Sequence, residues 1–278
     1  MQDDTLSNDR NEPSSSDETP GTGNVRVSVD GPIAEVIIDR PERKNALSLG
    51  MWREITGAFR TLGETADVRS IILRGAGSDF CAGADISEFS KTRHTVAQVH
   101  EYDRAVDDCC DAIAEAPKPV IAAIRGYCFG GGCGVALACD FRVSATGATF
   151  SIPAARLGIV YGLRETQNLL ALVGLSRAKR ILYTAERFGA DAAHSFGLVD
   201  EVVSDPVKAA RELAGVLAAN APLTIAGSKS ILTDLSMGLG KLDEAKTLKL
   251  VEIASQSEDH REARAAFLDK RQPEFKGK

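Results

Sequence analysis

The chain has 278 residues, of which 44% are hydrophobic and 26% are charged, and its net charge at pH 7 is −6. This composition is ordinary for a globular chain that buries a large core, and it excludes collagen, coiled coils and wholesale disorder. The acidic balance argues against nucleic acid as a partner, and the longest uncharged stretch through the glycine-rich centre, residues 126–139, is too short to span a membrane as a helix.

The first 24 residues form an acidic head that differs from the rest of the chain. They contain six acidic residues against one arginine, and they are rich in Ser, Asp, Pro and Gly. Because such a segment buries too little apolar surface to offset its ordering entropy, we predict that residues 1–24 are a disordered acidic tail. The head resembles neither a signal peptide nor a mitochondrial transit peptide, so we expect a cytoplasmic protein.

The segment from residue 25 to residue 153 alternates between strands and helices. Two apolar runs at 25–40 predict a β-hairpin around Asp30-Gly31-Pro32, and a helix follows with Ser48 as its N-cap. Apolar residues at helical spacing predict a helix over 96–113. The other predicted elements are strands at 70–74, 119–126, 141–145 and 148–153 and a helix at 130–140. This alternation is typical of an α/β protein.

Helices dominate the chain after residue 166. One strand is predicted at 198–203, and Pro222 marks the boundary before a helical C-terminal segment. The predicted helices span 166–173, 176–184, 190–195, 206–219 and 241–256.

The cysteines and histidines do not form a metal-binding pattern. No CxxC or HExxH motif is present, so we expect no catalytic metal. We interpret the cysteines as small buried hydrophobic residues of a reducing compartment. They are Cys81, Cys109, Cys110, Cys128, Cys133 and Cys139.

Two glycine-rich loops each follow a predicted buried strand. They are Cys81–Ile86 and Gly130–Gly134, and the second leads into a helix. If they converge, their backbone N–H groups could hold an anionic oxygen as an oxyanion hole. The second loop lacks the Lys-Ser/Thr of a phosphate-binding loop and the third glycine of a dinucleotide-binding loop. Spacing alone leaves open that the glycines only permit tight packing.

The residues around these loops resemble a known family. The run PKPVIAAIRGYCFGGGCGVALACDFRVSA, with FCAGADI before it, closely resembles the enoyl-CoA hydratase/isomerase (crotonase) superfamily. RPERKNALS is similar to the family's coenzyme A loop and FLDKRQPEF to its C-terminal signature. The resemblance covers residues 25–276. It implies an α/β spiral of ββα units with a core at 25–221, a helical C-terminal segment at 222–278, and homotrimers or dimers of trimers.

The resemblance also implies roles for particular residues. The N–H groups of Ala84 and Gly131 would form the oxyanion hole for an acyl-CoA thioester. Coenzyme A is part of that substrate, so no separate cofactor is expected. From the residues alone, the favoured interpretation of Arg43, Lys44 and Lys270 is solvated surface charge. The residues implied to contact coenzyme A are Arg43, Lys44, Ala46, Ala82, Asp85, Ile86, Phe267 and Lys270.

The chain departs from the family at both carboxylates that hydratases use. One would stand at position 134 and the other at position 154, where this chain has Gly134 and Ala154. Adding water to a conjugated double bond needs a base for the water and an acid for the α-carbon. Neither glycine nor alanine supplies these groups, so the ordinary hydratase mechanism is in doubt.

Tyr161 and Glu165 are the candidate replacements. LGIVYGL and the ending SEDHREARAAFLDKRQPEF are similar to methylmalonyl-CoA decarboxylase of the same superfamily, which has a functional tyrosine at the position matching Tyr161 but also keeps a glutamate at the position matching Gly134. Tyr161 is alternatively a half-buried aromatic residue, and Glu165 an acid that favours a helix N-terminus. Weaker candidates are Glu88, Arg156 and Arg164, each with solvent exposure as the alternative.

The sequence therefore predicts an enoyl-CoA hydratase/isomerase-family enzyme that stabilises a thioester enolate. Two alternatives stay open: a decarboxylase that uses Tyr161, and an acyl-CoA-binding protein without catalysis. The missing carboxylates favour the second alternative, and the glycine loops fit all three. A purely structural oligomer is the weakest interpretation.

Overall fold

The computed structural model describes residues 25–236 and 244–278. The predicted disordered head at 1–24 lies outside the described residues, as does the predicted start of the last long helix at 241–243. The expectations of a cytoplasmic location and of trimeric assembly stay predictions.

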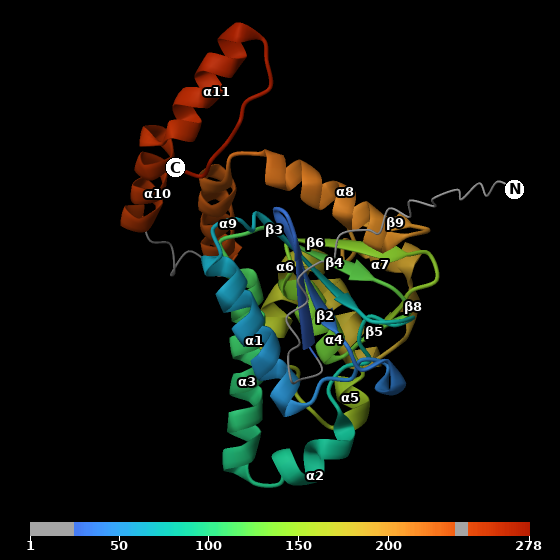
Figure 1. Cartoon of the computed structure of the whole chain (residues 1–278). Coiled ribbons are helices and arrows are strands. Elements are labelled where there is room, and N and C mark those ends of the chain that lie inside the picture. The colour runs from blue at the N-terminus through green and yellow to red at the C-terminus, as the bar shows by residue number, and fades with distance from the viewer. Residues whose placement is uncertain (1–24, 237–243) are drawn as a thin grey trace, which may run out of the picture.

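Six strands of the described chain form the main sheet, in the order β1-β2-β3-β4-β6-β9 (Figure 1). The predicted hairpin is confirmed, because β1 and β2 pair antiparallel with Val25 opposite Ile38. The other neighbours in this sheet are parallel. The strands are β1 (Val25–Asp30), β2 (Ile33–Ile38), β3 (Ser70–Gly75), β4 (Val120–Ile124), β6 (Phe141–Ala145) and β9 (Glu201–Val203).

A smaller sheet of the described residues lies beside the glycine loops. It contains β5 (Tyr127–Phe129), β7 (Thr149–Ser151) and β8 (Phe188–Gly189), in the order β5-β7-β8. The sequence did not predict β5 and β8, because runs of three and two residues carry no measurable alternation. A bridge between Cys81 and Cys128 joins β5 to the first glycine loop, so the small sheet brings the two loops together.

Helices cover both faces of the main sheet, which explains the continuous apolar runs of β3 and β4. Helix α8 packs on one face, and α1 and α3 pack together on the other side of the core. The predicted N-cap of α1 is confirmed, since Ser48 accepts a hydrogen bond from the Met51 N–H at 3.2 Å. The helices of this part are α1 (Leu49–Glu64), α2 (Phe89–Thr92), α3 (Val96–Ala114), α4 (Gly131–Ala138), α5 (Ala154–Leu157), α7 (Ala190–Phe196) and α8 (Pro206–Ala219).

The break predicted between the helices at 166–173 and 176–184 is confirmed, because α6 (Leu163–Thr184) is interrupted at Gly174, whose φ of 74° and ψ of 167° are not helical. Helix α11 (Glu258–Asp269) was not predicted, because its sequence is mostly polar and its apolar residues lie only beyond its first turn. In Figure 1, α10 (Glu244–Gln256) and α11 extend away from the sheets beyond α9 (Pro222–Ser236). No helix of the described residues is long and apolar enough to cross a membrane.

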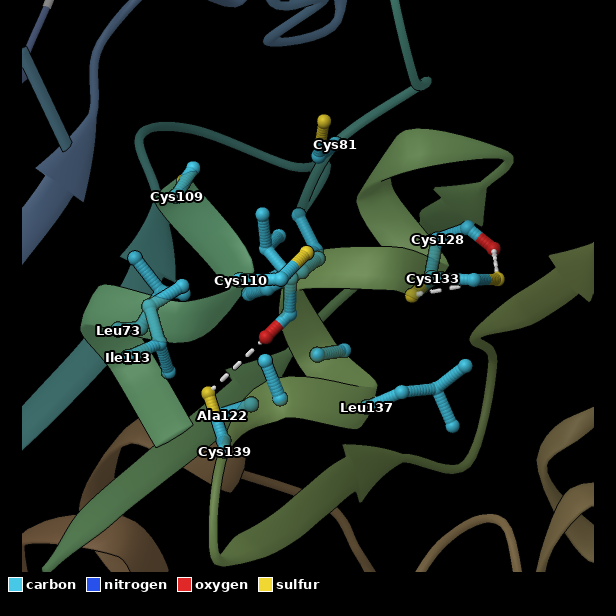
Figure 2. Close-up of a cluster of buried hydrophobic side chains, with 14 of the residues drawn as sticks. Leu73, Cys81, Cys109, Cys110, Ile113, Ala122, Cys128, Cys133, Leu137 and Cys139 are labelled. Carbon is cyan, nitrogen blue, oxygen red and sulfur yellow. Dashed lines mark hydrogen bonds between the residues drawn. The ribbon is translucent and has the colours of Figure 1, made fainter. Parts of the chain in front are cut away.

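The six cysteines are buried and unbridged, which confirms their interpretation as hydrophobic core residues. Figure 2 shows them gathered around Leu73, Ile113 and Leu137. Burial raises the pKa of Cys81 and of Cys139 to about 12. These thiols are therefore protonated and unreactive near neutral pH.

Asn45 fixes the loop that follows β2. Its side chain is fully buried, and Nδ2 donates to the carbonyls of Ala76 and Asp79 at 2.9 Å and 2.6 Å. Its Oδ1 accepts from the Arg40 N–H at 2.9 Å. The residue also has a φ of 57°, a conformation that asparagine adopts more readily than alanine.

We expect Asn45→Ala to lower the free energy of unfolding by about 3 kcal/mol, because it leaves buried backbone groups without partners. Urea denaturation measures the change. Asn220→Ala, at an exposed asparagine, is the matched control and should change stability by less than about 0.5 kcal/mol. Equal effects of the two substitutions would contradict this account of the loop.

Candidate active site

A cavity of about 390 Å³ lies between the two glycine loops, α1, α3 and the N-terminus of α6. Seven residues to which the sequence analysis assigned a role or a missing carboxylate line it. They are Ala82, Ala84, Ile86, Gly131, Ala154, Tyr161 and Glu165. The tertiary structure thus brings both glycine loops and both candidate catalytic side chains to one cavity.

The backbone N–H groups of Ala84 and Gly131 lie close together at this cavity. A Cβ atom built on Gly131 would lie 3.6 Å from the Ala84 nitrogen, and one built on Gly83 would lie 3.4 Å from the Gly131 nitrogen. Gly83 has a φ of 100°, which a side chain rarely permits. Within the described residues, neither N–H donates to another protein group. Both donors are therefore free to bind one oxygen atom.

The carboxylate of Glu165 occupies the space left by Gly134. A Cβ atom at Gly134 would overlap Oε1 of Glu165 and would lie 3.0 Å from its Cδ. Glu165 stands in the first turn of α6, and its Oε2 accepts from the Gly162 N–H at 3.2 Å. A Cβ at Gly162 would also crowd this oxygen, at 2.8 Å. The two glycines thus make room for a buried carboxylate.

The environment of Glu165 makes it a base suited to neutral pH. Burial raises its pKa to about 7. The Gly162 N–H and the Tyr161 hydroxyl oppose this rise, and the charges of Asp107 and Asp103 add to it. A carboxyl group with a pKa near 7 can both accept and return a proton at physiological pH.

Tyr161 connects Glu165 to the second glycine loop. Its side chain is half-buried, and its hydroxyl donates to the Gly130 carbonyl at 3.0 Å. Burial and the neighbouring carboxylate of Glu165 raise the pKa of Tyr161 well above its usual value. The hydroxyl is therefore neutral and bound to the loop that carries the Gly131 N–H.

Asp107 on α3 is a second carboxylate in the cavity wall. Its Oδ1 lies 3.7 Å from the point where Gly162 would carry a Cβ, so it is near Glu165. Burial and the charge of Asp111 raise its pKa, while Arg164 lowers it. No local pattern in the sequence indicates Asp107, because only the packing of α3 against α6 places it here.

The predicted coenzyme A loop lies next to the cavity. The Lys44 carbonyl accepts from the Ala82 N–H at 2.9 Å, so Arg43, Lys44 and Ala46 adjoin the first glycine loop. Arg43 and Lys44 are exposed, and Lys44 Nζ lies 4.1 Å from the centre of the Tyr127 ring. The loop therefore presents cations beside the cavity mouth.

Asp85 holds this region together through its side chain. Its buried carboxylate accepts from Arg40 at 2.7 Å and from the Ser87 hydroxyl at 2.6 Å. Burial opposes ionisation, but the hydrogen bonds from Ser87 and Arg40 lower its pKa overall. The Asp85 carboxylate is therefore occupied by hydrogen bonds from Arg40 and Ser87. Any contact of Asp85 with a ligand would have to come from its backbone.

Of the two C-terminal candidates, Lys270 has a described side chain, and it does not line this cavity. Lys270 is exposed just after α11. The side chain of Phe267 lies outside the described residues. Their predicted contacts with a nucleotide, from a neighbouring subunit, stay predictions.

The three weaker candidates have other surroundings. Glu88 accepts from the Leu49 N–H at 3.1 Å and so stabilises the start of α1. Arg164 pairs with Asp111 at 2.8 Å, and Arg156 is exposed away from the cavity lining. In the part of the chain that the structure describes, no three His, Cys, Asp or Glu side chains are grouped as a metal site requires.

Two aromatic residues of the cavity wall were missed by the sequence reasoning. Trp52 of α1 is fully buried, and its indole N–H donates to the hydroxyl of Tyr102 on α3 at 3.0 Å. Both occupy apolar helix positions, and apolar spacing does not distinguish a cavity wall from an ordinary core. Only the crossing of α1 and α3 reveals their contact.

Comparisons with known proteins show which family the chain resembles over most of its length. A family model described as enoyl-CoA hydratase/isomerase matches residues 29–278. The short-chain-enoyl-CoA hydratase of Clostridium acetobutylicum is 35% identical over 259 residues, covering 90% of this chain and 97% of that protein. The peroxisomal Delta(3,5)-Delta(2,4)-dienoyl-CoA isomerase of Arabidopsis thaliana is 33% identical over 267 residues, covering 90% and 95%.

The fold is also shared with solved structures. A crystal structure of an enoyl-CoA hydratase/carnithine racemase from Magnetospirillum magneticum superposes with a TM-score of 0.88 at 34% identity, covering 93% of this chain and 97% of that one. The expected α/β fold of the crotonase type is therefore confirmed.

The raised pKa of Glu165 predicts a pH-dependent stability difference. Because the folded state favours the protonated carboxyl, wild-type protein loses stability as pH rises from about 4.5 to about 7. We expect Glu165→Gln to avoid this loss and to gain up to about 3 kcal/mol relative to wild type between pH 4.5 and pH 8. Urea denaturation across this range measures the difference.

The matched control is Glu54→Gln, at an exposed glutamate on α1. It is the reference for a glutamate that is not buried. A stability difference for Glu165→Gln that changes no more with pH than that of Glu54→Gln would show that Glu165 titrates as it does in the unfolded chain.

Proposed function

The chain belongs to the enoyl-CoA hydratase/isomerase family, and from that premise we propose that it moves a proton on the acyl group of an acyl-CoA thioester, with Glu165 as the acid–base group. The observation that carries the proposal is the buried Glu165 carboxylate in the space beside Gly134. The resemblance implies that hydratases of the family carry one of their two catalytic carboxylates at the position that matches Gly134. Glu165 thus supplies a carboxylate to the same region from a different helix.

The two free N–H groups support enolate formation. A thioester oxygen placed between Ala84 and Gly131 would accept both hydrogen bonds. When a proton leaves the α-carbon, its electron pair moves onto this oxygen, and the preorganised N–H groups stabilise the charge without reorganisation. The exposed cations Arg43 and Lys44 would bind the phosphates of coenzyme A beside the cavity.

A single base beside the acyl group fits double-bond isomerisation best. Glu165 would remove a proton from C2 of a 3-enoyl thioester, and the electron pair would pass to the thioester oxygen as a dienolate. The protonated Glu165 would then return the proton to C4, which gives the 2-enoyl thioester. A carboxyl with a pKa of about 7 serves both steps. No other reactant is needed.

Hydration is a second candidate function, and the position of Asp107 supports it. Water addition needs a base for the water and an acid for the α-carbon, and Asp107 is a second carboxylate in the same wall. Glu165 and Asp107 would then share the acid and base roles that two glutamates have in the hydratases of the family.

Decarboxylation through Tyr161 has less support. A malonyl-type substrate would bring a carboxylate next to the buried Glu165, and like charges in such a site repel. The cation in the cavity wall, Arg93, already pairs with Asp103 at 2.6 Å. We propose instead that Tyr161 positions the second glycine loop through its bond to Gly130.

The first test is a turnover screen with 3-hexenoyl-CoA, crotonyl-CoA and methylmalonyl-CoA, in which liquid chromatography separates the hexenoyl-CoA isomers of equal mass before mass spectrometry. We expect 3-hexenoyl-CoA to become 2-hexenoyl-CoA, with Glu165→Gln at least about 100-fold slower because it has no base. Glu54→Gln should retain wild-type rates. A product 18 Da heavier than the enoyl substrate would support hydration instead.

Other outcomes of the screen oppose the proposal. Loss of 44 Da from methylmalonyl-CoA would favour the decarboxylase. No conversion of any thioester, with binding confirmed by calorimetry, would favour the acyl-CoA-binding protein.

A substitution at Gly134 tests more directly whether the Glu165 carboxylate is the base. Gly134→Ala adds a methyl group where the Glu165 carboxylate lies, and the end of that flexible side chain is the part that must move. We expect turnover to fall about as far as in Glu165→Gln, with stability changed by less than about 1 kcal/mol. The double variant should be no slower than either single variant.

Gly215→Ala, in α8 with open space around the glycine, is the matched control and should keep wild-type turnover. Full activity in Gly134→Ala would remove Glu165 from the proposed chemistry.

A further inference from the structure

The cavity wall formed by α1 and α3 contains a hydroxyl donor that the protein leaves unused. Tyr102 is 2% exposed and lines the cavity. Its oxygen accepts the Trp52 indole N–H at 3.0 Å. This is the one hydrogen bond of the Tyr102 side chain among the described residues, so the O–H hydrogen has no acceptor there. A tyrosine hydroxyl can donate one bond while accepting another.

The surroundings of Tyr102 hold its ring in place. Phe89 packs edge-on against the ring, with 5.6 Å between centres, and the Arg93 guanidinium lies 5.0 Å from the ring centre. Arg93 is itself paired with Asp103 at 2.6 Å. The ring is thus packed from two sides and its oxygen is fixed by Trp52. What remains for the cavity is an oriented hydroxyl donor.

Burial keeps this hydroxyl neutral. It raises the pKa of Tyr102 to about 12, against the opposing effects of Trp52 and Arg93, while Glu88 and Asp85 raise it further. At physiological pH the group therefore donates a hydrogen bond and does not lose its proton. A buried donor without an acceptor costs free energy, which a ligand oxygen would recover.

The position of Trp52 sets where such an oxygen would lie. Atoms Cζ2 and Cη2 of its ring would touch a Cβ built on Gly131, at 2.8 Å, so this edge of the ring lies against the second glycine loop. The indole nitrogen Nε1 belongs to the same ring, two bonds away from Cζ2. Its N–H donates to the Tyr102 hydroxyl. One indole ring therefore contacts both the second glycine loop and the Tyr102 hydroxyl. An oxygen bound by Tyr102 would accordingly lie a few carbons along the acyl chain from a thioester held at that loop.

We propose that Tyr102 is a specificity-determining residue that donates a hydrogen bond to an oxygen carried on the acyl group, near C3 or C4. The inference rests on the proposed acyl-CoA site and deepens it. The preferred ligands are acyl-CoA thioesters with a hydroxyl or keto oxygen at that position, over the corresponding saturated acyl groups. A site built to bond such an oxygen discriminates against the analogue that lacks it.

The experiment is isothermal titration of the full chain with two ligand pairs: 3-hydroxybutanoyl-CoA against butanoyl-CoA, and 4-oxopentanoyl-CoA against pentanoyl-CoA. Mass spectrometry checks that each ligand stays intact. We expect the oxygenated member of at least one pair to bind about tenfold more tightly to wild type. In Tyr102→Phe this preference should fall below about twofold, while affinity for the saturated member stays unchanged.

Tyr183→Phe, at a tyrosine that is 71% exposed on α6, is the matched control and should keep the preference. If Tyr102→Phe does not fold, Trp52→Phe is the second variant. It keeps the Tyr102 hydroxyl but removes the N–H that orients it, so it should reduce the preference between pair members. A purely structural role would change the affinity for both members alike.

Equal binding of both members of each pair to wild type would overturn the inference, and so would a preference that survives in Tyr102→Phe. Failure of the proposed function looks different, since it appears as no binding of any acyl-CoA or as no turnover in the separate screen. The two proposals can therefore fail independently.

Discussion

The close approach of helices α4 and α6 is the contact on which the rest of the site depends. Gly134 carries no side chain, so the carboxylate of Glu165 fits against the α4 backbone. The same approach places Tyr161 where its hydroxyl bonds the Gly130 carbonyl. A buried base and the loop that supplies the Gly131 N–H are thereby held as neighbours. Burial in this contact, rather than any charged partner, is what raises the pKa of Glu165 towards neutrality.

The second glycine loop is fixed from more than one direction. Tyr161 bonds its carbonyl at Gly130, and the ring of Trp52 lies against Gly131. The first loop is held in turn by β5, because the Phe129 N–H donates to the Cys81 carbonyl at 2.9 Å. These contacts keep two N–H donors in place before any ligand arrives. Preorganisation of this kind is what makes such donors effective in stabilising an enolate.

The chain keeps a carboxylate at the site although the family's usual positions are occupied by Gly134 and Ala154. Removing a side chain from α4 both deletes one carboxylate and opens the space that another carboxylate enters from α6. Hydration and isomerisation, the activities named for the relatives, both need a proton acceptor beside the acyl group. In the proposed function the base therefore comes from α6, through Glu165, and lies in the space beside Gly134.

The sequence by itself determined the α/β class, most helices and strands, and the two glycine loops, while Ala84 and Gly131 were named within those loops only through the resemblance to a known family. These features depend on local periodicity and on short motifs, which a chain carries in neighbouring residues. It could name Glu165 only as a candidate, because an acid in a first helical turn has an ordinary explanation.

Only the tertiary structure decided that the Glu165 carboxylate fills the space beside Gly134, that Asp107 lies near it, and that Trp52 bonds Tyr102. Each of these pairs is far apart in sequence and meets where two helices cross. Helix crossings are set by the packing of whole faces, which no spacing within one helix encodes.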